Sequence, residues 1–319
     1  MSPELRARVM TSVSGGARGA RGERRWRPRL VASLRLLAIV VVASVVAAGL
    51  QVRAQRQREL AQGRSELLLE VQRSVSTLTD EDRKLPARVE REVQQHAAAT
   101  YAGDLLPESL RAEGGLSELL SRPTLYLRGS LDVLARPGGV AEAASTSRTD
   151  AFVLCLLQPP AARSEQALRT AARVAQGRGA GMAPTAHVQR LAPVLEVLPL
   201  LSGDAQRRIA AAEHAALRDY RKLYELAPVR TALKTVKARQ LLLVVDEPGD
   251  AKTPAELDGE RPHAVRVTLS NLQDRTLQLR FRQQVDPSWL SAATRAEYAS
   301  GVDSCGLALD LRKALGVGD

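Results

Sequence analysis

Two cysteines are the side chains whose chemistry this sequence constrains most tightly. Cys155 and Cys305 are the only cysteines in the chain. An even number is what a structural disulfide requires outside the cytoplasm. A bridge would close a loop of about 150 residues and stabilise the fold by roughly 4–5 kcal/mol through chain entropy. The alternative is two buried free thiols, because cysteine packs as a small apolar residue. The pair predicts a disulfide.

Oxygen-bearing side chains gather in a segment rich in proline and glycine, residues 247–263. The candidate ligands in and beside it are Asp246, Glu256, Asp258 and His263. Hard cations bind clusters of carboxylates, so a metal or ligand site would be sought here first. The spacing is not that of an EF-hand, and the turn residues are typical of a solvated connection between strands. That second interpretation is favoured.

The sequence contains none of the common catalytic or nucleotide-binding motifs. Its four histidines form no HExxH motif, and Ser130 lacks the flanking glycines of a nucleophile elbow. There is no phosphate-binding or dinucleotide-binding glycine loop. These observations favour a role without catalysis and indicate no cofactor.

A long apolar stretch near the N-terminus is expected to determine on which side of a membrane the rest of the chain lies. Between Arg29 and Arg53 lie 23 residues, thirteen of them Leu, Ile or Val. As a helix they extend about 34 Å, enough to cross a hydrocarbon core of roughly 30 Å. Summed over these side chains, insertion is favourable by about 4–8 kcal/mol, against at most about 3 kcal/mol for Arg35. The sequence predicts a single transmembrane helix over residues 30–52.

The flanks of this stretch predict its orientation. Residues 1–29 form a basic tail without apolar periodicity, expected to be disordered and cytoplasmic. The predicted anchor flanks combine a basic cluster with one interfacial aromatic: Arg24, Arg25, Trp26, Arg27, Arg29 and Arg35. Positive flanks stay inside, so the remainder is expected outside. A cleaved signal peptide ending at 46–48 is the alternative, but the polar lead is long for one.

Charge distribution argues against a nucleic-acid partner. The formal net charge is +11, but residues 1–52 hold nine arginines against only two glutamates. The rest of the chain is therefore close to balanced, with opposite charges interspersed as on a solvated helix surface. Arginine far outnumbers lysine and alanine is abundant, which is associated with a bacterial genome. The main domain is thus expected in a periplasm, with the anchor in the inner membrane.

Beyond the anchor, residues 53–105 are predicted to form a membrane-proximal helical stalk. Leu60, Leu67, Val71, Val75 and Leu78 recur at helical spacing. This stripe predicts packing on the chain's own domain, with self-association of two stalks as the alternative. Thr79 and the acidic residues after it predict a break and a new helix start.

Residues 106–319 are predicted to be an α+β domain, rich in helix around a roughly five-stranded mixed or antiparallel sheet. Strands are expected at 124–134, 151–158, 240–246, 264–270 and 277–285, the last two as a hairpin. Helices are expected at 107–120, 163–176, 186–198 and 204–227, with a continuation to 239 and a C-terminal helical stretch after 286.

These features predict an anchored envelope protein with a binding or scaffolding role and an envelope protein as its partner. An extracytoplasmic sensor of a ligand or metal, using the acidic segment, is the alternative function. An envelope enzyme ranks third, because no motif supports it.

Overall fold

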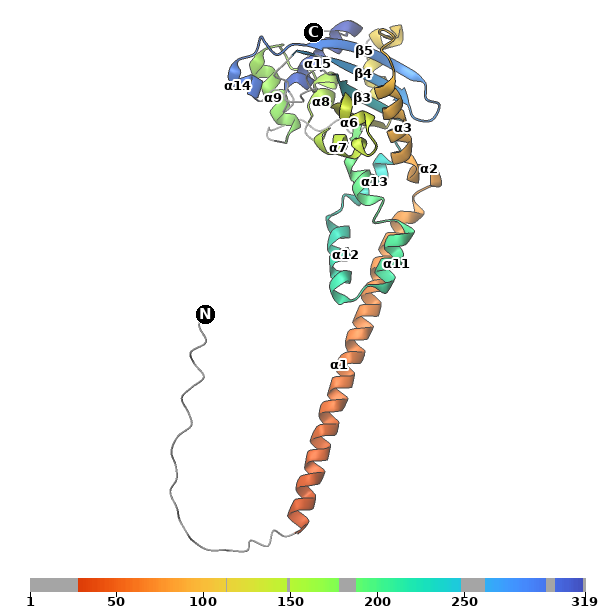
Figure 1. Ribbon diagram of the computed structural model, residues 1–319, viewed down its shortest axis with the longest axis vertical. Helices are drawn as coiled ribbons and strands as arrows, with labels where there is room; N and C mark the ends of the chain where they lie inside the picture. The colour runs from red at the N-terminus through yellow and green to blue at the C-terminus, as the bar shows by residue number, and fades with distance from the viewer. Residues whose placement is uncertain are drawn as a thin grey trace, which may run out of the picture. The chain divides into compact units, whose positions relative to one another are not determined.

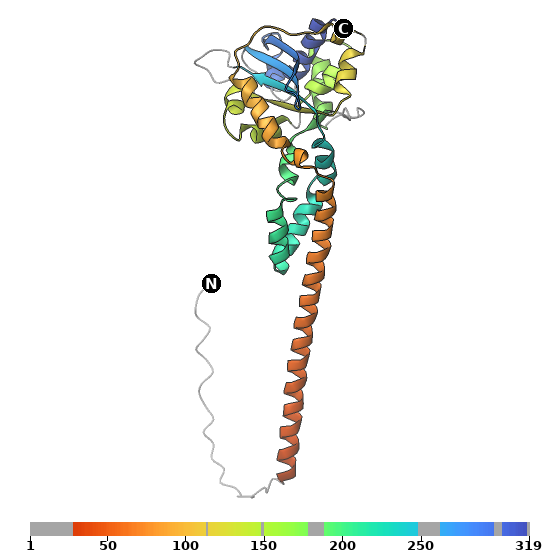
Figure 2. The same ribbon diagram turned by 90° about the vertical axis from the view of Figure 1, so that its right-hand side faces the viewer.

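The structure is a computed structural model, and it describes residues 28–112, 114–147, 150–177, 188–247, 262–296 and 302–317. The chain divides into two compact units, residues 1–59 and 60–319. The predicted cytoplasmic tail, residues 1–29, lies outside the described residues except for its last two positions. Figures 1 and 2 show the elements in two views, and Figure 1 labels many of them.

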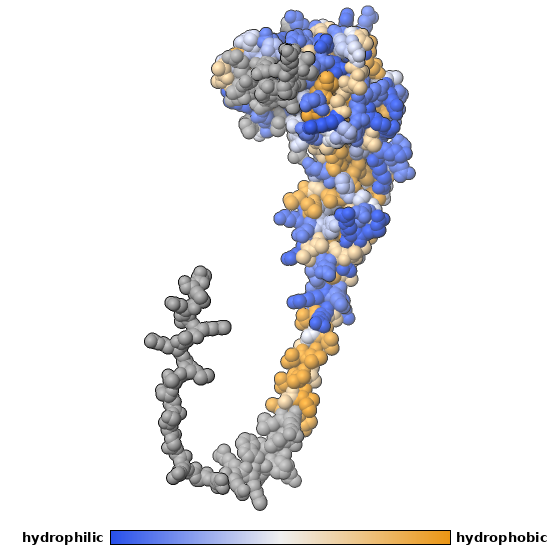
Figure 3. All heavy atoms as spheres, viewed as in Figure 1, coloured by the Kyte–Doolittle hydropathy of each residue, from blue (hydrophilic) through white to orange (hydrophobic). Residues whose placement is uncertain are grey.

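Helix α1 (Pro28–Ser76) begins in the first unit and contains the predicted anchor. From Leu36 to Val52 its large apolar side chains are 49–67% exposed, and the apolar surface of this part of α1 is visible in Figure 3. Among the described residues, this helix alone is long and apolar enough to cross a membrane. An isolated apolar helix in water has nothing to bury its side chains against, so membrane anchoring is possible.

The part of α1 that belongs to the second unit packs on its own domain, as the apolar stripe predicted. Leu67 and Val71 are buried in a core cluster that also contains Leu217 and Tyr224. These partners lie on α12 (His214–Leu226), which follows α11 (Gly203–Ala211). Polar contacts support the packing: Arg64 Nε donates to the Ala212 carbonyl at 2.8 Å, and the hydroxyls of Ser74 and Tyr224 lie 2.8 Å apart.

Two helices lead from α1 to the sheet. In α2 (Asp80–Arg83), the Thr79 side chain accepts from the Asp82 backbone N–H and the Asp82 carboxylate accepts from the Thr79 backbone N–H. This reciprocal capping explains why the chain starts a new helix here. Helix α3 (Leu85–Ala98) then buries Leu85, Val89 and Val93 against one face of the sheet.

The sheet has five strands in the order β2-β1-β3-β4-β5. The strands are β1 (Thr124–Ser130), β2 (Val188–Arg190), β3 (Gln240–Asp246), β4 (His263–Asn271) and β5 (Leu277–Val285). Strands β2, β1 and β3 run parallel, whereas β4 and β5 are antiparallel to their neighbours. The predicted α+β class with a mixed sheet is confirmed.

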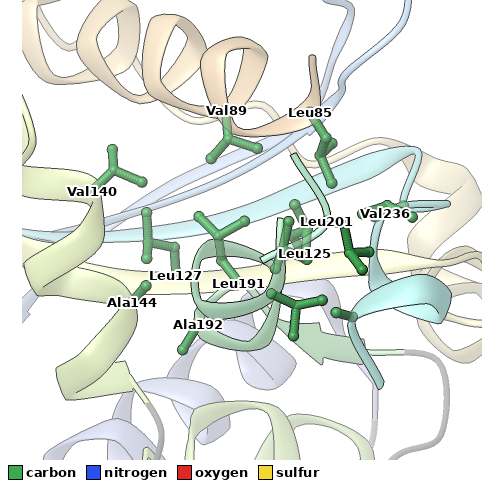
Figure 4. Packing of buried hydrophobic residues seen from close by; sticks show 14 of the residues in the cluster. Leu85, Val89, Leu125, Leu127, Val140, Ala144, Leu191, Ala192, Leu201 and Val236 are labelled. Carbon is green, nitrogen blue, oxygen red and sulfur yellow. The ribbon is translucent and has the colours of Figure 1, made fainter. Parts of the chain in front are cut away.

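Apolar side chains form a core on each face of the sheet. One cluster combines Leu125 and Leu127 of β1 with α3, α7 and α10, and Figure 4 shows part of this packing. The other combines Leu242 and Val244 of β3 with α8, α9 and α15. The helices involved, with those around them, are α4 (Glu108–Arg111), α5 (Gly115–Leu120), α6 (Leu131–Ala135), α7 (Gly139–Thr146), α8 (Phe152–Leu157), α9 (Glu165–Ala175), α10 (Ala192–Val197), α13 (Val229–Thr235), α14 (Ala292–Ala296) and α15 (Val302–Leu315).

Several predicted elements are confirmed and others need correction. The strands at 240–246, 264–270 and 277–285, with the final hairpin, and the helix at 163–176 are present. The predicted strand at 151–158 is wrong, because those residues form α8. The predicted strand at 124–134 ends at Ser130 and continues as α6. The region predicted as helix 186–198 begins with the short strand β2, and the long helix predicted from residue 204 is divided into α11 and α12.

Part of the outer edge of the sheet is covered by a short segment, Tyr101–Leu105, which we call the strap. Leu105 forms one antiparallel bridge with Arg280 of β5. Its N–H donates to the Arg280 carbonyl at 2.7 Å, and its carbonyl accepts from the Arg280 N–H at 3.0 Å. An uncovered edge strand presents unpaired backbone groups to other chains, so the strap shields part of β5.

Candidate functional site

A buried arginine joins the two central parallel strands where both end. Arg128 of β1 lies opposite Val244 of β3, two residues before Asp246. Its Nε donates to Asp246 Oδ2 at 2.9 Å and its Nη2 to Asp246 Oδ1 at 2.6 Å. This bidentate pair is fully enclosed, with the two side chains 7% and 0% exposed. The carboxyl ends of parallel strands are where α/β proteins commonly place their sites.

Two further aspartates and one serine complete what we call the Arg128 cluster. Arg128 Nη2 lies 2.5 Å from Asp303 Oδ2, and Nη1 lies 3.4 Å from Asp150 Oδ2. Ser304 accepts a hydrogen bond from Arg128 Nη1 and donates to Asp150 Oδ2 at 2.7 Å. The cluster therefore connects β1 and β3 to the start of α15 and to the residues just before α8.

His263 extends the Arg128 cluster to β4. Its Nε2 lies 3.3 Å from Asp246 Oδ1, and its side chain is 5% exposed. Asp246 is the last residue of β3 and His263 the first of β4. The segment between them, which contains the predicted ligands Glu256 and Asp258, therefore begins and ends beside the cluster.

Opposing effects set the protonation of the buried acids. Burial alone would raise the pKa of Asp246, but the Arg128 charge and hydrogen bonds from His263 and Arg128 lower it to about 2. Burial raises the pKa of Asp303, and Arg128 only partly opposes this. For Arg128, burial would lower the pKa, but Asp246 and Asp303 outweigh it and the pKa is raised. Arg128 and Asp246 are thus a charged pair, whereas Asp303 more readily holds a proton.

The predicted metal-site residues are only partly brought together. Asp246 and His263 are adjacent, whereas Glu256 and Asp258 lie outside the described residues. Both oxygens of Asp246 already accept from Arg128, so a cation there would compete with a guanidinium. Within the described ranges, no group of three or more His, Cys, Asp or Glu side chains is placed to hold a metal ion.

The residues predicted to flank the membrane anchor are only partly described by the structure. Arg24, Arg25, Trp26 and Arg27 lie outside the described residues. Arg29 and Arg35 fall within the first turns of α1, where the structure describes the backbone but not these side chains.

The predicted disulfide is confirmed. Cys155 and Cys305 are bonded, with their Cα atoms 5.1 Å apart and a sequence separation of 150 residues. The bond joins α8 to α15, and both cysteines are fully buried in the second core cluster. Because Ser304 and Asp303 immediately precede Cys305, the disulfide and the Arg128 cluster fasten the same end of α15.

Sequence reasoning missed Arg128, Asp150 and Asp303. A signal for Arg128 was present, since it is the one charged residue in the otherwise apolar and neutral strand Thr124–Ser130. Charged residues are rarely fully buried unless they are paired. Nothing in the sequence identified its partners, because they lie 22, 118 and 175 residues away.

The Arg128 cluster is suited to holding β1, β3 and the start of α15 together. Every charged group of the Arg128 cluster has an internal partner, and Arg128 is 6% exposed. Within the Arg128 cluster, the hydroxyl of Ser304 accepts from Arg128 and donates to Asp150, which itself lies 3.4 Å from Arg128 Nη1. Comparison with protein-family models gives no match to this chain, and comparisons with curated proteins and with solved structures give none either.

Proposed function

We propose that this chain is a single-pass membrane protein whose main domain lies outside the cytoplasm and binds or scaffolds another envelope component. Residues 30–52 are the anchor, and the domain extends into the periplasm of a bacterial cell. The proposed role is non-catalytic, because the charged groups of the Arg128 cluster pair with one another.

The observation that carries this proposal is the bond between Cys155 and Cys305. Disulfides persist in oxidising compartments and are rare in the cytosol. This one lies in the same core that holds α8 and α15 together. A protein that depends on such a bond is suited to folding after export, which agrees with an apolar N-terminal helix as the export signal.

The orientation is supported by the sequence flanks. Six arginines lie in the 15 residues before Leu30, against four in the 15 after Val52. An excess of positive charge before the span keeps that end in the cytoplasm. The domain after the span is then translocated.

The proposed compartment of the main domain is tested by the redox state of Cys155 and Cys305 in intact cells. Free thiols are blocked by rapid acid quench and alkylation, and the protein is run on non-reducing gels. We expect a faster band that reduction removes, and its absence from a variant without residues 28–52. A reporter enzyme fused beyond residue 60 that is active only in the cytosol would overturn the proposal.

The binding role is tested by photo-crosslinking from defined positions in the native membrane. Leu226 and Trp289 are exposed, at 74% and 49%, and each is replaced in turn by a photoreactive residue. Buried Val194, at 0%, is the matched control. We expect a discrete crosslinked protein from an exposed position and none from the control. No captured protein from any exposed position would contradict a scaffolding role.

A second candidate function is a sensor that binds a cation or small ligand through the acidic segment 246–263. The observation that favours it is the approach of His263 to Asp246, 3.3 Å apart, at the two ends of that segment. It predicts a rise in melting temperature with a divalent cation, reduced by Glu256→Gln with Asp258→Asn.

A further inference from the structure

The outer edge of β5 is only partly covered by the strap. Strand β5 is last in the sheet order, and only one of its nine residues is bridged by backbone on the outer side among the described residues. The bridging strap residues are largely exposed, with Leu105 at 38%. A longer partner strand would satisfy more of this edge than the strap does.

The strap is held mainly by two arginines of β5. Arg280 Nε donates to the Gly103 carbonyl at 2.6 Å, and its Nη2 donates to the Ala102 carbonyl at 3.3 Å. The guanidinium carbons of Arg280 and Arg282 lie 5.7 and 5.5 Å from the centre of the Tyr101 ring. All of these contacts lie at the surface, where a cation over an aromatic ring is only weakly stabilising.

A carboxylate completes the strap's contacts. Asp104 Oδ1 accepts from the backbone N–H of Arg282 at 3.1 Å, so a side chain replaces the backbone partner that a regular strand would supply. Tyr101 also donates to Asp104. The strap thus presents an aromatic ring, a carboxylate three residues later and an apolar residue next to it.

We propose that the strap is an internal substitute for a partner, and that β5 docks an extended segment of another protein with the same aromatic and acidic pattern. The occupant is defined by charge complementarity: it places an aromatic ring under Arg280 and Arg282 and a carboxylate at the Arg282 N–H. Because the strap pairs antiparallel to β5, the residues that precede this aromatic ring extend along β5 toward Val285 by strand addition. This inference rests on the proposed binding role and names the surface through which that role operates.

A partner segment must compete with the strap for the edge of β5. The strap is joined to its site through a short chain, so its effective concentration at β5 is on the order of millimolar. Any partner must displace it, and the apparent affinity is reduced by the fraction of molecules in which the strap is closed. Weakening the strap should therefore strengthen binding of a partner segment.

The test uses full-length protein in lipid nanodiscs and a fluorescent peptide that copies residues 100–106, TYAGDLL. Binding is measured by fluorescence anisotropy. We expect a variant with Tyr101→Ala and Asp104→Ala to bind the peptide at least about tenfold more tightly than the unaltered protein. Leu105→Pro, which removes the bridging N–H, should act in the same direction through a different contact. Glu108→Ala, an exposed change just outside the strap, should match the unaltered protein.

Two further measurements locate the peptide. Arg280→Ala, added to the weakened strap, should abolish the gain in affinity. In the variant with Tyr101→Ala and Asp104→Ala, hydrogen exchange at the Arg280 and Arg282 amides should slow when peptide binds. Unaltered affinity in both strap variants, or a gain that survives Arg280→Ala, would overturn the docking edge. If crosslinking still captured a partner in that case, only the docking edge would be lost and the proposed function would remain.

Discussion

Arg128 is the residue whose loss the fold should tolerate least. Replacing it with Met would leave the carboxylates of Asp246, Asp150 and Asp303 buried without their shared cation. Removing one partner of a buried ion pair costs about 3–5 kcal/mol, and we expect that loss in the free energy of unfolding measured in urea. Arg136→Ala, which breaks an exposed pair with Glu142, should cost less than about 1 kcal/mol. Equal stabilities of the two variants would show that the cluster is not structural.

His96 gives the domain a predicted pH dependence. Burial lowers its pKa below 6.5, Glu92 opposes this, and Arg266 and Arg280 lower it further. The folded protein therefore binds fewer protons than the unfolded chain, so stability is full above pH 6.5 and declines as the pH falls through that value.

The measurement is the melting temperature between about pH 8 and pH 5. His96→Gln should flatten the decline relative to the unaltered protein, and His214→Gln, at an exposed position, should leave it unchanged. The comparison between variants removes the contribution of carboxylates such as Asp303, whose raised pKa acts in the opposite direction. A decline that persists in His96→Gln would assign it to another group.

Sequence reasoning at this scale succeeds where the chain leaves only one choice of partner or where the partners lie close together in the sequence. Cys155 and Cys305 could be paired because the chain has no other cysteine, and the proximity of Asp246 and His263 follows from their positions at the ends of β3 and β4. Arg128 could be suspected as a buried charge, but its partners could not be named. Their proximity depends on how α8 and α15 pack on the sheet, which no spacing in the sequence encodes.

At the scale of elements, helix α8 was wrongly predicted as a strand. Residues 151–158 are a short apolar run, and such runs do not distinguish a strand from a buried helix by periodicity. The structure makes them helical because the Asp150 side chain accepts from the Phe152 N–H at 2.7 Å, and because α8 is buried against α15 on the sheet face. By contrast, β4 and β5 were recognisable from their alternation and the turn between them.

The packing of α1 on α12 makes a prediction at this scale. Leu67 and Leu69 lie two positions apart on α1, but Leu67 is 1% exposed and Leu69 is 55% exposed. Leu67→Ala should lower the free energy of unfolding by about 2–5 kcal/mol, because it leaves a cavity among packed side chains. Leu69→Ala should change it by less than about 0.5 kcal/mol. Chemical denaturation of the two variants compares them directly, and similar losses would contradict packing of this face on the domain.

For the whole molecule, composition and pattern were enough to predict a mixed α+β domain preceded by an apolar helix. They could not predict the strand order, because β2 has only three residues and its pairing with β1 joins segments far apart in the sequence. They also could not predict that the chain turns back between α11 and α12. No glycine or proline marks that turn at Ala212 and Glu213.

The fate of the N-terminal segment separates an anchor from a removable signal. A protein carrying one epitope tag before residue 1 and another after residue 319 should keep both tags on a single membrane-bound species, because the polar lead is long for the n-region of a signal peptide. Replacing Val41 and Val42 with Arg puts two charges at the centre of the proposed span, each costing about 2.5–3.5 kcal/mol of insertion. That change should shift the protein to the soluble fraction. Loss of the first tag with retention of the second, and cleavage blocked by Ala48→Leu, would instead identify a signal peptide.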